Sequence, residues 1–361
     1  MEVGGDMKLR CSIWRGGTSK GVFLLDSDLP TEPEMRDRVI LRIMGSPDPR
    51  QIDGLGGADI LTSKVMIMAP PSSEDADVDY TFGQVAIDRP FIDYRGNCGN
   101  LSAAVGPFAI DESLVKASEP VTRVRMRNLN TGKIIIAEFP VKGGRFVEEG
   151  DYRVDGVPGT GSRIDLDYSQ TVGSLTGKLL PTGHPRDKIG GVEVSVVDLG
   201  NPVVFLKAEA LGKGGDETPE ELDEDEKFMA ELEEIRGLVA KNIGLEKSPA
   251  FPFISIVSPP KDFRAIGGVA YPASSCHFLA RIIGIGRVHK AFAGTGAVCC
   301  AVAAKLKGSV VSEVAGKLGR EVLIGHPSGV MEVEAEVEGD KVLRASYGRT
   351  ARKIMEGFVY V

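Results

Sequence analysis

The chain is poor in the features that mark membrane, metal-binding or nucleic-acid-binding proteins. Its 361 residues include only one Trp and four His, and the net charge is −8 at pH 7. No apolar run approaches the roughly 18 residues that indicate a transmembrane helix. An acidic chain without a basic stripe is a poor match for general nucleic-acid binding. What remains is an ordinary globular composition, 42% hydrophobic and 26% charged, long enough for two domains.

The cysteines do not form a metal-binding or disulfide pattern. The five are Cys11, Cys98, Cys276, Cys299 and Cys300. No pair has CxxC spacing, and none lies with histidine at metal-ligand spacing. The first ten residues lack the basic start and apolar core of a secretory signal. We therefore expect reduced thiols in a cytoplasmic protein, without a metal site. Met7 is a second candidate for the natural start, with residues 1–6 as an extension.

A short pattern that occurs twice is the most informative feature of the chain. Residues 97–100 read Asn-Cys-Gly-Asn, residues 293–296 read Ala-Gly-Thr-Gly, and both run into small apolar residues. Each copy predicts a glycine turn that opens a helix, over residues 98–110 and 293–306. A helix start presents free N–H groups and the positive end of the helix dipole, and therefore favours anions. The pattern indicates two similar halves with an acidic substrate between them.

The two copies differ at one position, where Cys98 in the first corresponds to Ala293 in the second. A thiol at a helix start is expected to be biased toward the reactive thiolate. A buried structural cysteine is the alternative interpretation. The position of Cys98 between Asn97 and Gly99 favours the reactive one. The other four cysteines are expected to be structural.

The rest of each half reads as short strands around one helix that is almost free of charge. In the first half we expect a helix at 33–44 and strands at 8–14, 21–25, 64–69, 78–86, 121–127 and 133–139. A glycine-rich loop at 156–183 leads to the second half, with an acidic helix expected at 217–242. Strands are expected there at 192–199, 202–207, 251–257, 276–283, 321–324, 330–338 and 341–347.

A helix that is apolar on all sides must be buried. The economical architecture is therefore α+β, with a sheet wrapped around a central helix, and it occurs twice. The expected domains are residues 1–185 and 186–361, and the last strand is able to return to the first domain. A parallel βαβ sheet is disfavoured, because strands follow one another without alternating helices.

Residues 15–21 read Arg-Gly-Gly-Thr-Ser-Lys-Gly, a glycine turn with two hydroxyls and two cations. One interpretation is a β-hairpin turn. The other is a cradle in which backbone N–H groups and the Thr18 and Ser19 hydroxyls bind a carboxylate, with Lys20 beside them. The spacing of a Walker A phosphate loop is absent.

Lys64 follows Thr62 and Ser63 and begins an apolar strand. A lysine at a strand edge is usually solvated, whereas burial would favour the neutral amine and make Lys64 a base. Farther along, residues 326–329 predict a turn in which Ser328 adds a donor. Arg349 and Arg352 are candidates for holding a carboxylate or are surface cations. The acidic run at 216–234 is expected to be a solvated helix face.

Together these segments resemble the PrpF family of the diaminopimelate-epimerase-like fold. The matching segments are residues 15–21, 45–49, 51–57, 62–64, 96–100, 105–108, 294–296, 325–329 and 349–352. They cover nearly the whole chain in order. The resemblance implies two pseudo-symmetric domains, each with a β-barrel-like sheet around a central helix, and an active site in the cleft between them.

The resemblance also implies the chemistry. Diaminopimelate epimerases have a cysteine at both helix starts, so Ala293 argues against racemisation by two thiols. Proteins of the PrpF type move a carbon–carbon double bond in unsaturated acids such as aconitate, methylaconitate, methylitaconate and oxalomesaconate. The implied catalytic residues are Lys64 and Cys98. We assign substrate binding to Thr18, Ser19, Lys20, Asn97, Gly99, Asn100, Gly294, Thr295, Gly296 and Ser328.

The expected reaction is a cofactor-independent 1,3-allylic proton shift in a small unsaturated di- or tricarboxylate. Lys64 removes a γ-proton, the charge spreads onto the α-carboxylate, and N–H and hydroxyl donors stabilise it. Lys64 or Cys98 then protonates the α-carbon. An anionic substrate favours the lysine ammonium, so either burial outweighs that effect, or Cys98 is the base and Lys64 supplies charge.

Two alternatives stay open at this point. One is a keto–enol tautomerase acting on 4-oxalomesaconate at the same site. The other is a non-catalytic carboxylate-binding accessory to an aconitase-like enzyme. The expected partners are the small acid and, as one option, a second copy in a homodimer, with no nucleic acid and no membrane.

Overall fold

The computed structural model describes residues 7–248 and 250–361, and these form two compact units. The first unit comprises residues up to Arg153 together with Gly159–Asp165 and Arg349–Val361, and the second comprises Val154–Pro158 and Leu166–Gly348. The expected extension at residues 1–6 lies outside the described residues. The division of the chain after residue 185 stays a prediction. No helix in the described part is both long and apolar enough to cross a membrane.

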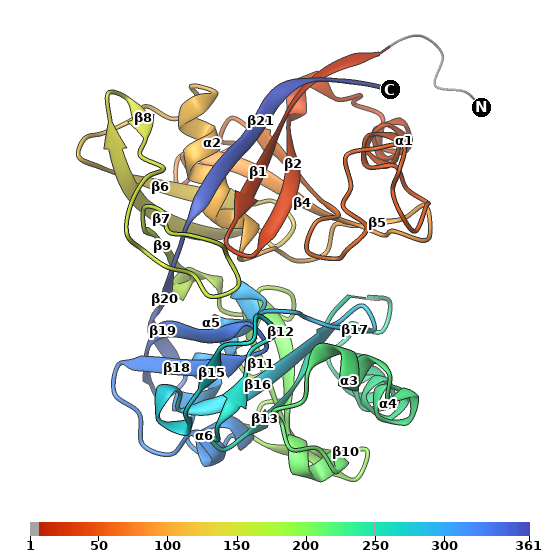
Figure 1. Cartoon of the computed structure of the whole chain (residues 1–361), viewed down its shortest axis with the longest axis vertical. Helices are drawn as coiled ribbons and strands as arrows, with labels where there is room; N and C mark the ends of the chain where they lie inside the picture. Colours follow the sequence, from red (N-terminus) through yellow and green to blue (C-terminus); the bar gives the residue numbers. More distant parts are fainter. Residues whose placement is uncertain (1–6, 249) are drawn as a thin grey trace. The chain divides into compact units, whose positions relative to one another are not determined.

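The first unit is a mixed sheet in the order β21–β1–β2–β3–β4–β6–β7. Figure 1 shows β21, β1 and β2 side by side. The pairs β2–β3 and β4–β6 are parallel and the others antiparallel. Its strands are β1 (Lys8–Gly16), β2 (Ser19–Leu25), β3 (Lys64–Ala69), β4 (Val78–Val85), β6 (Val121–Asn128), β7 (Lys133–Lys142) and β21 (Ala351–Tyr360). Short strands pair with β4 and β7, namely β5 (Ile92–Asp93) and β8 (Arg145–Phe146).

The second unit repeats this order as β10–β11–β12–β13–β16–β18–β19, followed by β20. As in the first unit, the third and fifth neighbouring pairs of the order, β12–β13 and β16–β18, are parallel. The strands are β10 (Asp187–Ile189), β11 (Val192–Leu199), β12 (Asn201–Lys207), β13 (Phe253–Ser258), β16 (Phe278–Gly284), β17 (Arg287–Val288), β18 (Glu321–His326), β19 (Gly329–Glu338) and β20 (Lys341–Arg349). The repeated pairing confirms the expectation of two similar halves.

Each sheet curls around a helix of small apolar residues. In the second unit α5 (Gly294–Lys305) packs against β11 and β12 as well as β18 and β19, which lie toward opposite ends of the sheet. Every residue of α5 except Lys305 is buried, as its uncharged sequence requires. In the first unit the corresponding segment packs against β1, β2, β6, β8 and β21. The expected sheet around a central helix is therefore present twice.

The helix expected at 98–110 is not continuous. A 3₁₀ turn, η2 (Leu101–Ala104), leads into the α-helix α2 (Val105–Asp111). Pro107 explains the break, because it has no N–H to donate and its ring crowds the carbonyl one turn earlier. Proline is tolerated in the first turn of a helix, which is where α2 places it.

An outer helix layer covers the other face of each sheet. In the first unit α1 (Pro33–Met44) buries Val39, Ile40, Ile43 and Met44 against residues of β1, β2 and β3. It has the predicted bounds, with Pro33 in the first turn and Gly45 in the left-handed conformation that ends many helices. In the second unit α4 (Glu226–Asn242) packs its apolar side against β11, β12 and β13.

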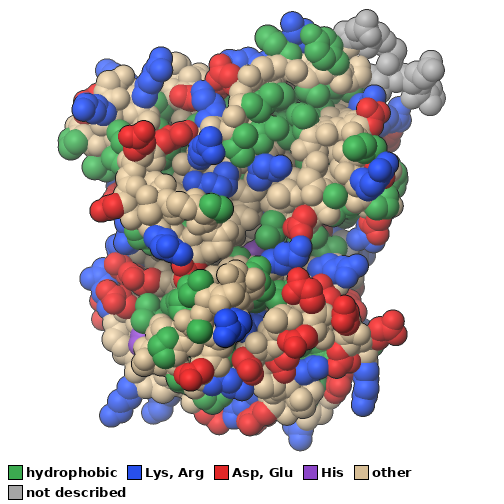
Figure 2. All heavy atoms as spheres, viewed as in Figure 1, with side chains coloured by type: hydrophobic (Ala, Val, Ile, Leu, Met, Phe, Trp, Pro, Cys, Tyr) green, Lys and Arg blue, Asp and Glu red, His purple; other side chains and the backbone are tan. Residues whose placement is uncertain are grey.

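The acidic helix expected at 217–242 is two helices, α3 (Pro219–Asp223) and α4. The break occurs because the Asp225 carboxylate accepts a hydrogen bond from the Phe228 N–H at 3.0 Å and so caps a new helix. The acidic side chains of this segment are largely exposed. Figure 2 shows them gathered where Figure 1 labels α3 and α4, which confirms a solvated helix face.

The remaining elements are short. They are the helix α6 (Val310–Ala315), the strands β9 (Ile164–Asp167), β14 (Phe263–Arg264) and β15 (Ala270–Tyr271), and the 3₁₀ turns η1 (Asp26–Asp28), η3 (Ser169–Thr171), η4 (Ala208–Leu211) and η5 (Ala273–Ser275). The expected loop at 156–183 thus contains β9 and η3. Cys276 follows η5 and precedes β16, so it does not lie in a strand as expected, although it is buried.

A buried carboxylate organises the loop before β10. Asp198 accepts hydrogen bonds from the N–H groups of Ser174, Leu175 and Thr176 at 3.0, 2.9 and 2.8 Å. The hydroxyls of Ser174 and Thr176 also donate to it. Asp198 is fully buried, so water cannot take the place of its carboxylate as the acceptor for these donors.

Replacing Asp198 with Ala is expected to lower the free energy of unfolding by at least about 3 kcal/mol, because each buried donor left without a partner costs about 1–3 kcal/mol. Urea denaturation followed by circular dichroism measures the loss. Asp198→Asn keeps one acceptor oxygen and should lose less. Equal midpoints for the wild-type protein and Asp198→Ala would contradict this account.

Candidate active site

The glycine-rich segment at 15–21 is the tip of the β1–β2 hairpin. Gly16 pairs with Ser19, which leaves Gly17 and Thr18 as a two-residue turn, and Gly17 has a positive φ of 49°. The hairpin interpretation of this segment is confirmed. The hairpin tip also lies directly against the segment that follows Cys98. A Cβ on Gly16 would be 2.6 Å from the Asn100 carbonyl oxygen and 2.9 Å from the Leu101 Cα.

Cys98 caps the short helical segment that follows it. Its carbonyl accepts from the Ser102 N–H at 2.9 Å, and its Sγ accepts from the Leu101 N–H at 3.5 Å. The thiol donates to the Ser19 hydroxyl at a sulfur–oxygen distance of 3.7 Å. The side chain is buried and the thiol is free. Cys98 therefore lies between a helix start and the hairpin tip.

Neighbouring asparagines fix the shape of this turn. Asn97 Oδ1 accepts from the hydroxyls of Tyr80 and Ser102 at 3.1 and 3.3 Å. Asn100 Oδ1 accepts from Arg349 Nε at 2.7 Å. Both asparagines are buried. These contacts give Asn97 and Asn100 a clear part in holding the Cys98 turn, and their assignment to substrate binding stays a prediction.

Lys64 is buried, with a relative exposure of 7%. It is the first residue of β3 and lies opposite Gln84 of β4. Its Nζ donates to Gln84 Oε1 at 2.6 Å and lies 5.3 Å from the centre of the Phe82 ring. No carboxylate of the described residues forms an ion pair with it. The burial that the base role needs is present, and the partner is neutral.

Strand β2 brings Lys64 and the Cys98 turn to the same place. Ser19 and Gly21 are two residues apart on this strand and so share a face. Ser19 contacts the Cys98 thiol, while a Cβ on Gly21 would be 2.6 Å from Leu101 Cδ2 and 2.9 Å from the Lys64 carbonyl oxygen. The start of β3 at Lys64 and the turn that carries Cys98 therefore both lie against strand β2.

Two arginines, Arg15 and Arg349, lie beside the hairpin tip. Arg15 Nη1 donates to the Thr350 carbonyl at 2.8 Å and the Gly17 carbonyl at 3.1 Å. Burial lowers the pKa of the Arg15 guanidinium, and the positive charge of Arg352 lowers it further. The negative charge of Glu148 has a smaller effect in the opposite direction. Arg349 is buried. The sequence alone left open whether it holds a carboxylate or is a surface cation.

The Thr18 hydroxyl is the unsatisfied polar group of the hairpin tip. Its oxygen is buried and has no hydrogen-bond partner among the described residues. The neighbouring Lys20 amine makes no ion pair with any described residue. A buried polar group without a partner is costly unless something binds there. With the nearby arginines, these groups suit a carboxylate.

The other predicted binding residues lie in the second unit. Gly294, Thr295 and Gly296 form the first turn of α5, and no hydrogen bond engages their N–H groups within the described ranges. The Thr295 hydroxyl accepts from Asn201 Nδ2 at 2.8 Å. The Ser328 hydroxyl donates to the Lys290 carbonyl at 2.5 Å, so it can serve a ligand only as an acceptor. The N–H groups of this turn are the ones a helix leaves free.

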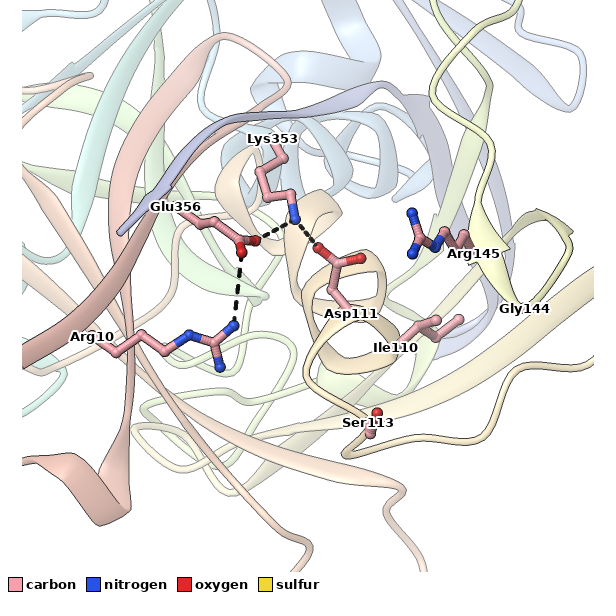
Figure 3. Close-up of a pocket in the computed structure, with 8 residues that line it drawn as sticks. All are labelled: Arg10, Ile110, Asp111, Ser113, Gly144, Arg145, Lys353 and Glu356. Atoms are coloured by element: carbon pink, nitrogen blue, oxygen red, sulfur yellow. Dashed lines mark hydrogen bonds and ion pairs between the residues drawn. The ribbon is translucent and has the colours of Figure 1, made fainter. Parts of the chain in front are cut away.

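A cavity of about 440 Å³ on the first unit is lined by none of the predicted site residues. Figure 3 shows the residues that line it. It is lined by Arg10, Ile110, Asp111, Ser113, Gly144, Arg145, Lys353 and Glu356. Lys353 Nζ contacts Asp111 Oδ2 at 2.5 Å and Glu356 Oε2 at 2.7 Å. These ion pairs occupy the positive charge that Lys353 brings to the cavity. Across the described ranges, no three His, Cys, Asp or Glu side chains are grouped so as to hold a metal ion.

Gln84, the hydrogen-bond partner of Lys64, was not predicted from the sequence. It lies two residues from the end of the strand expected at 78–86 and carries no motif of its own. A glutamine in an otherwise largely apolar strand was the available signal. Its pairing with Lys64 depends on the register of β3 and β4, which becomes visible only in the folded sheet.

Comparison with known proteins gives consistent matches over the whole chain. The family described as PrpF protein matches residues 6–361. The chain is 48% identical to 3-methylitaconate isomerase of Eubacterium barkeri, over 98% of this chain and 97% of that protein. It is 40% identical to 4-oxalomesaconate tautomerase of Pseudomonas putida, over 99% of this chain and 97% of that protein.

Solved structures give the fold. A crystal structure of methylitaconate Δ-isomerase superimposes with a TM-score of 0.83 at 47% identity, covering 99% of this chain and 96% of that one. A hydroxyproline epimerase from Agrobacterium vitis superimposes with a TM-score of 0.59 at 12% identity, covering 100% and 94%. The second match concerns the fold alone, and it confirms the epimerase-like fold that the sequence predicts.

Proposed function

The chain belongs to the PrpF family, and we propose that it is a cofactor-independent isomerase that shifts a carbon–carbon double bond in a small unsaturated di- or tricarboxylate. Its relatives named 3-methylitaconate isomerase and methylitaconate Δ-isomerase support this class of reaction. An acid of the methylitaconate or aconitate type is the proposed substrate. A cytoplasmic location and assembly as a homodimer stay predictions from the sequence.

The observation that carries the proposal is the buried Lys64 amine with a neutral hydrogen-bond partner. Burial disfavours the ammonium, while a carboxylate partner would favour it. The Lys64 amine is buried and its Nζ donates to the neutral Gln84 carboxamide, and among the described residues no carboxylate pairs with it. An amine in this setting is suited to accept a proton from carbon.

The proposed reaction begins when the Lys64 amine removes a proton from the γ-carbon of the bound acid. The electron pair of that C–H bond becomes part of a dienolate, which places negative charge on the α-carboxylate. Delivery of a proton to the α-carbon completes the shift and restores a neutral carbon skeleton. Lys64 can return the proton it took, or the Cys98 thiol can deliver its own and be reprotonated by Lys64.

Groups on the first unit suit the binding of the carboxylates. The free Thr18 hydroxyl, the Ser19 hydroxyl and the buried Arg349 lie at or against the hairpin tip. Preorganised donors of this kind stabilise developing negative charge, at about 3–4 kcal/mol for a well-placed one. The free N–H groups of the α5 turn are a second set of donors that we assign to a carboxylate of the substrate.

A second candidate is keto–enol tautomerisation of 4-oxalomesaconate. The identity of 40% with a tautomerase named for that acid favours it. The same base and the same stabilisation of an oxyanion would serve both reactions, since both move a proton beside a carbonyl or carboxylate group. The two acids differ in shape, and a pocket separates such ligands by only about 1–3 kcal/mol per methylene.

Proton NMR in D₂O with methylitaconate, cis-aconitate and 4-oxalomesaconate tests the proposal. We expect the double bond of at least one acid to migrate, with deuterium entering at the allylic carbon. The acid that reacts fastest identifies the substrate class. Saturable binding without exchange for any of the acids would contradict the proposal and favour a non-catalytic carboxylate-binding protein.

A further inference from the structure

We propose that Gln84 is the positioning residue of the proton-transfer step, because its carboxamide oxygen holds the Lys64 amine in both protonation states. This inference rests on the proposed function, in which Lys64 is the base. Gln84 acts through Lys64 and needs no contact with the substrate. The two side chains are a cross-strand pair of β3 and β4, with Lys64 Nζ 2.6 Å from Gln84 Oε1.

The orientation of the Gln84 carboxamide is fixed by its other end. Its Nε2 donates to the Ser63 carbonyl at 2.9 Å and to the Ile60 carbonyl at 3.2 Å. A flipped amide would direct its oxygen at two carbonyl oxygens and its NH₂ group at the Lys64 amine, losing all three hydrogen bonds. The segment before β3 therefore determines which atom Lys64 meets.

An acceptor oxygen at this place suits a base that gains and loses a proton. Both the ammonium and the neutral amine carry N–H groups that can donate to Gln84, so the hydrogen bond survives the transfer. In the neutral amine one N–H is directed at Gln84, and the lone pair is therefore directed elsewhere. A carboxylate at position 84 would instead hold Lys64 as the ammonium.

Other charged and titratable groups lie on the elements around Lys64. They are Lys20 on β2, Asp79 and Tyr80 on β4, Asp93 on β5, Asp26 and Asp28 on η1, Asp59 in the loop before β3, and Cys98. None of them forms a hydrogen bond or ion pair with Lys64 in the described part of the chain. Asp26 and Asp93 are paired with Arg36 and Arg95. Gln84 is therefore the direct polar partner through which Lys64 can be tuned.

Two substitutions of Gln84 should move the pH dependence of kcat/KM in opposite directions. Gln84→Glu introduces a negative charge beside the amine. The rising limb of the plot of kcat/KM against pH should therefore move to higher pH by about one to three units, with activity recovered in base. Gln84→Met removes the acceptor from a buried site, so the limb should move to lower pH. A residue that only supported the fold would reduce activity without moving the limb.

Gln51→Glu is the matched control. Gln51 is also buried and donates to the Ser63 hydroxyl at 2.8 Å and the Ser46 hydroxyl at 3.0 Å. Within the described part of the chain it forms no hydrogen bond with Lys64. The Gln51→Glu substitution makes the same change of charge in the same part of the fold. It should lower stability and leave the rising limb of the pH profile in place. Thermal melts of all three variants report whether each is folded.

A titration of the free protein separates this inference from the proposed function. Carbon-13 NMR of ε-labelled lysine, assigned with Lys64→Arg, reports protonation of Lys64 without turnover. Opposite displacements of its midpoint in Gln84→Glu and Gln84→Met support the inference even if no tested acid reacts, in which case the proposed function fails. Unmoved or equally moved midpoints overturn the inference, whatever the activity.

Discussion

Replacing Lys64 with Met is expected to reduce kcat by ~10²–10⁴-fold, the usual contribution of a positioned acid–base group. Methionine has a similar length and is apolar, so it can fill the space beside the Phe82 ring without leaving a buried charge. The Gln84 oxygen loses its partner in this variant. Rates of double-bond migration measured by NMR or ultraviolet absorbance give the effect, and a thermal melt establishes that the variant is folded.

Two further variants show what Lys64 does. Lys64→Arg keeps the positive charge but cannot supply a neutral amine at ordinary pH. Activity lost equally in Met and Arg variants identifies Lys64 as a base, whereas activity kept by Arg identifies it as an electrostatic clamp. Cys98→Ala should then abolish turnover if the thiol is the base. Turnover close to normal in Lys64→Met would refute both roles of the lysine.

Adding one methyl group at Gly16 is expected to reduce kcat/KM by about 100-fold, the effect typical of an error of about 1 Å in placing reacting groups. The new Cβ would be 2.6 Å from the Asn100 carbonyl oxygen and 2.9 Å from the Leu101 Cα. Both are backbone atoms, so no side-chain rotation relieves the clash. Either the hairpin tip with Ser19 or the turn with Cys98 has to move.

Gly357→Ala is the matched control for Gly16→Ala. Gly357 lies on β21, which pairs with β1, and a Cβ there would meet only the flexible end of Met355 at 3.7 Å. It should change neither kinetics nor stability, while Gly16→Ala should also lose about 1–3 kcal/mol of stability through overpacking. Unchanged kinetics in Gly16→Ala would mean that contact between the hairpin and the turn does not determine the site.

Local signals in the sequence predicted those elements whose ends are set locally. The bounds of α1 follow from Pro33 and Gly45, and those of β3 follow from an apolar run that begins after polar residues. The repeated glycine turns predicted two similar halves, which the pairing of the strands confirms. The burial of α5 follows from its lack of charge.

Features that depend on register or on competing caps could not be predicted in the same way. Pro107 breaks the helix after Cys98, and Asp225 starts a new helix within an acidic run, although either residue is also compatible with a longer helix. The pairing of Lys64 with Gln84 joins residues 20 apart in the chain and depends on the alignment of two strands. The burial of Arg349 likewise depends on packing between distant segments.

The repeated strand order has a consequence for the stereochemical course of the reaction. In the second unit the register of β13 and β16 places Phe253 opposite Gly284, where the first unit has Lys64 opposite Gln84, and the ring of Phe253 fills the space beside that glycine. Ala293 likewise stands where the first unit has Cys98. One copy of the repeated scaffold thus carries the groups to which we assign proton transfer, while the other has Phe253, Gly284 and Ala293 there. On the proposed function, with Lys64 both taking and returning the proton, the two transfers are suprafacial, and migration of the double bond replaces inversion of a stereocentre.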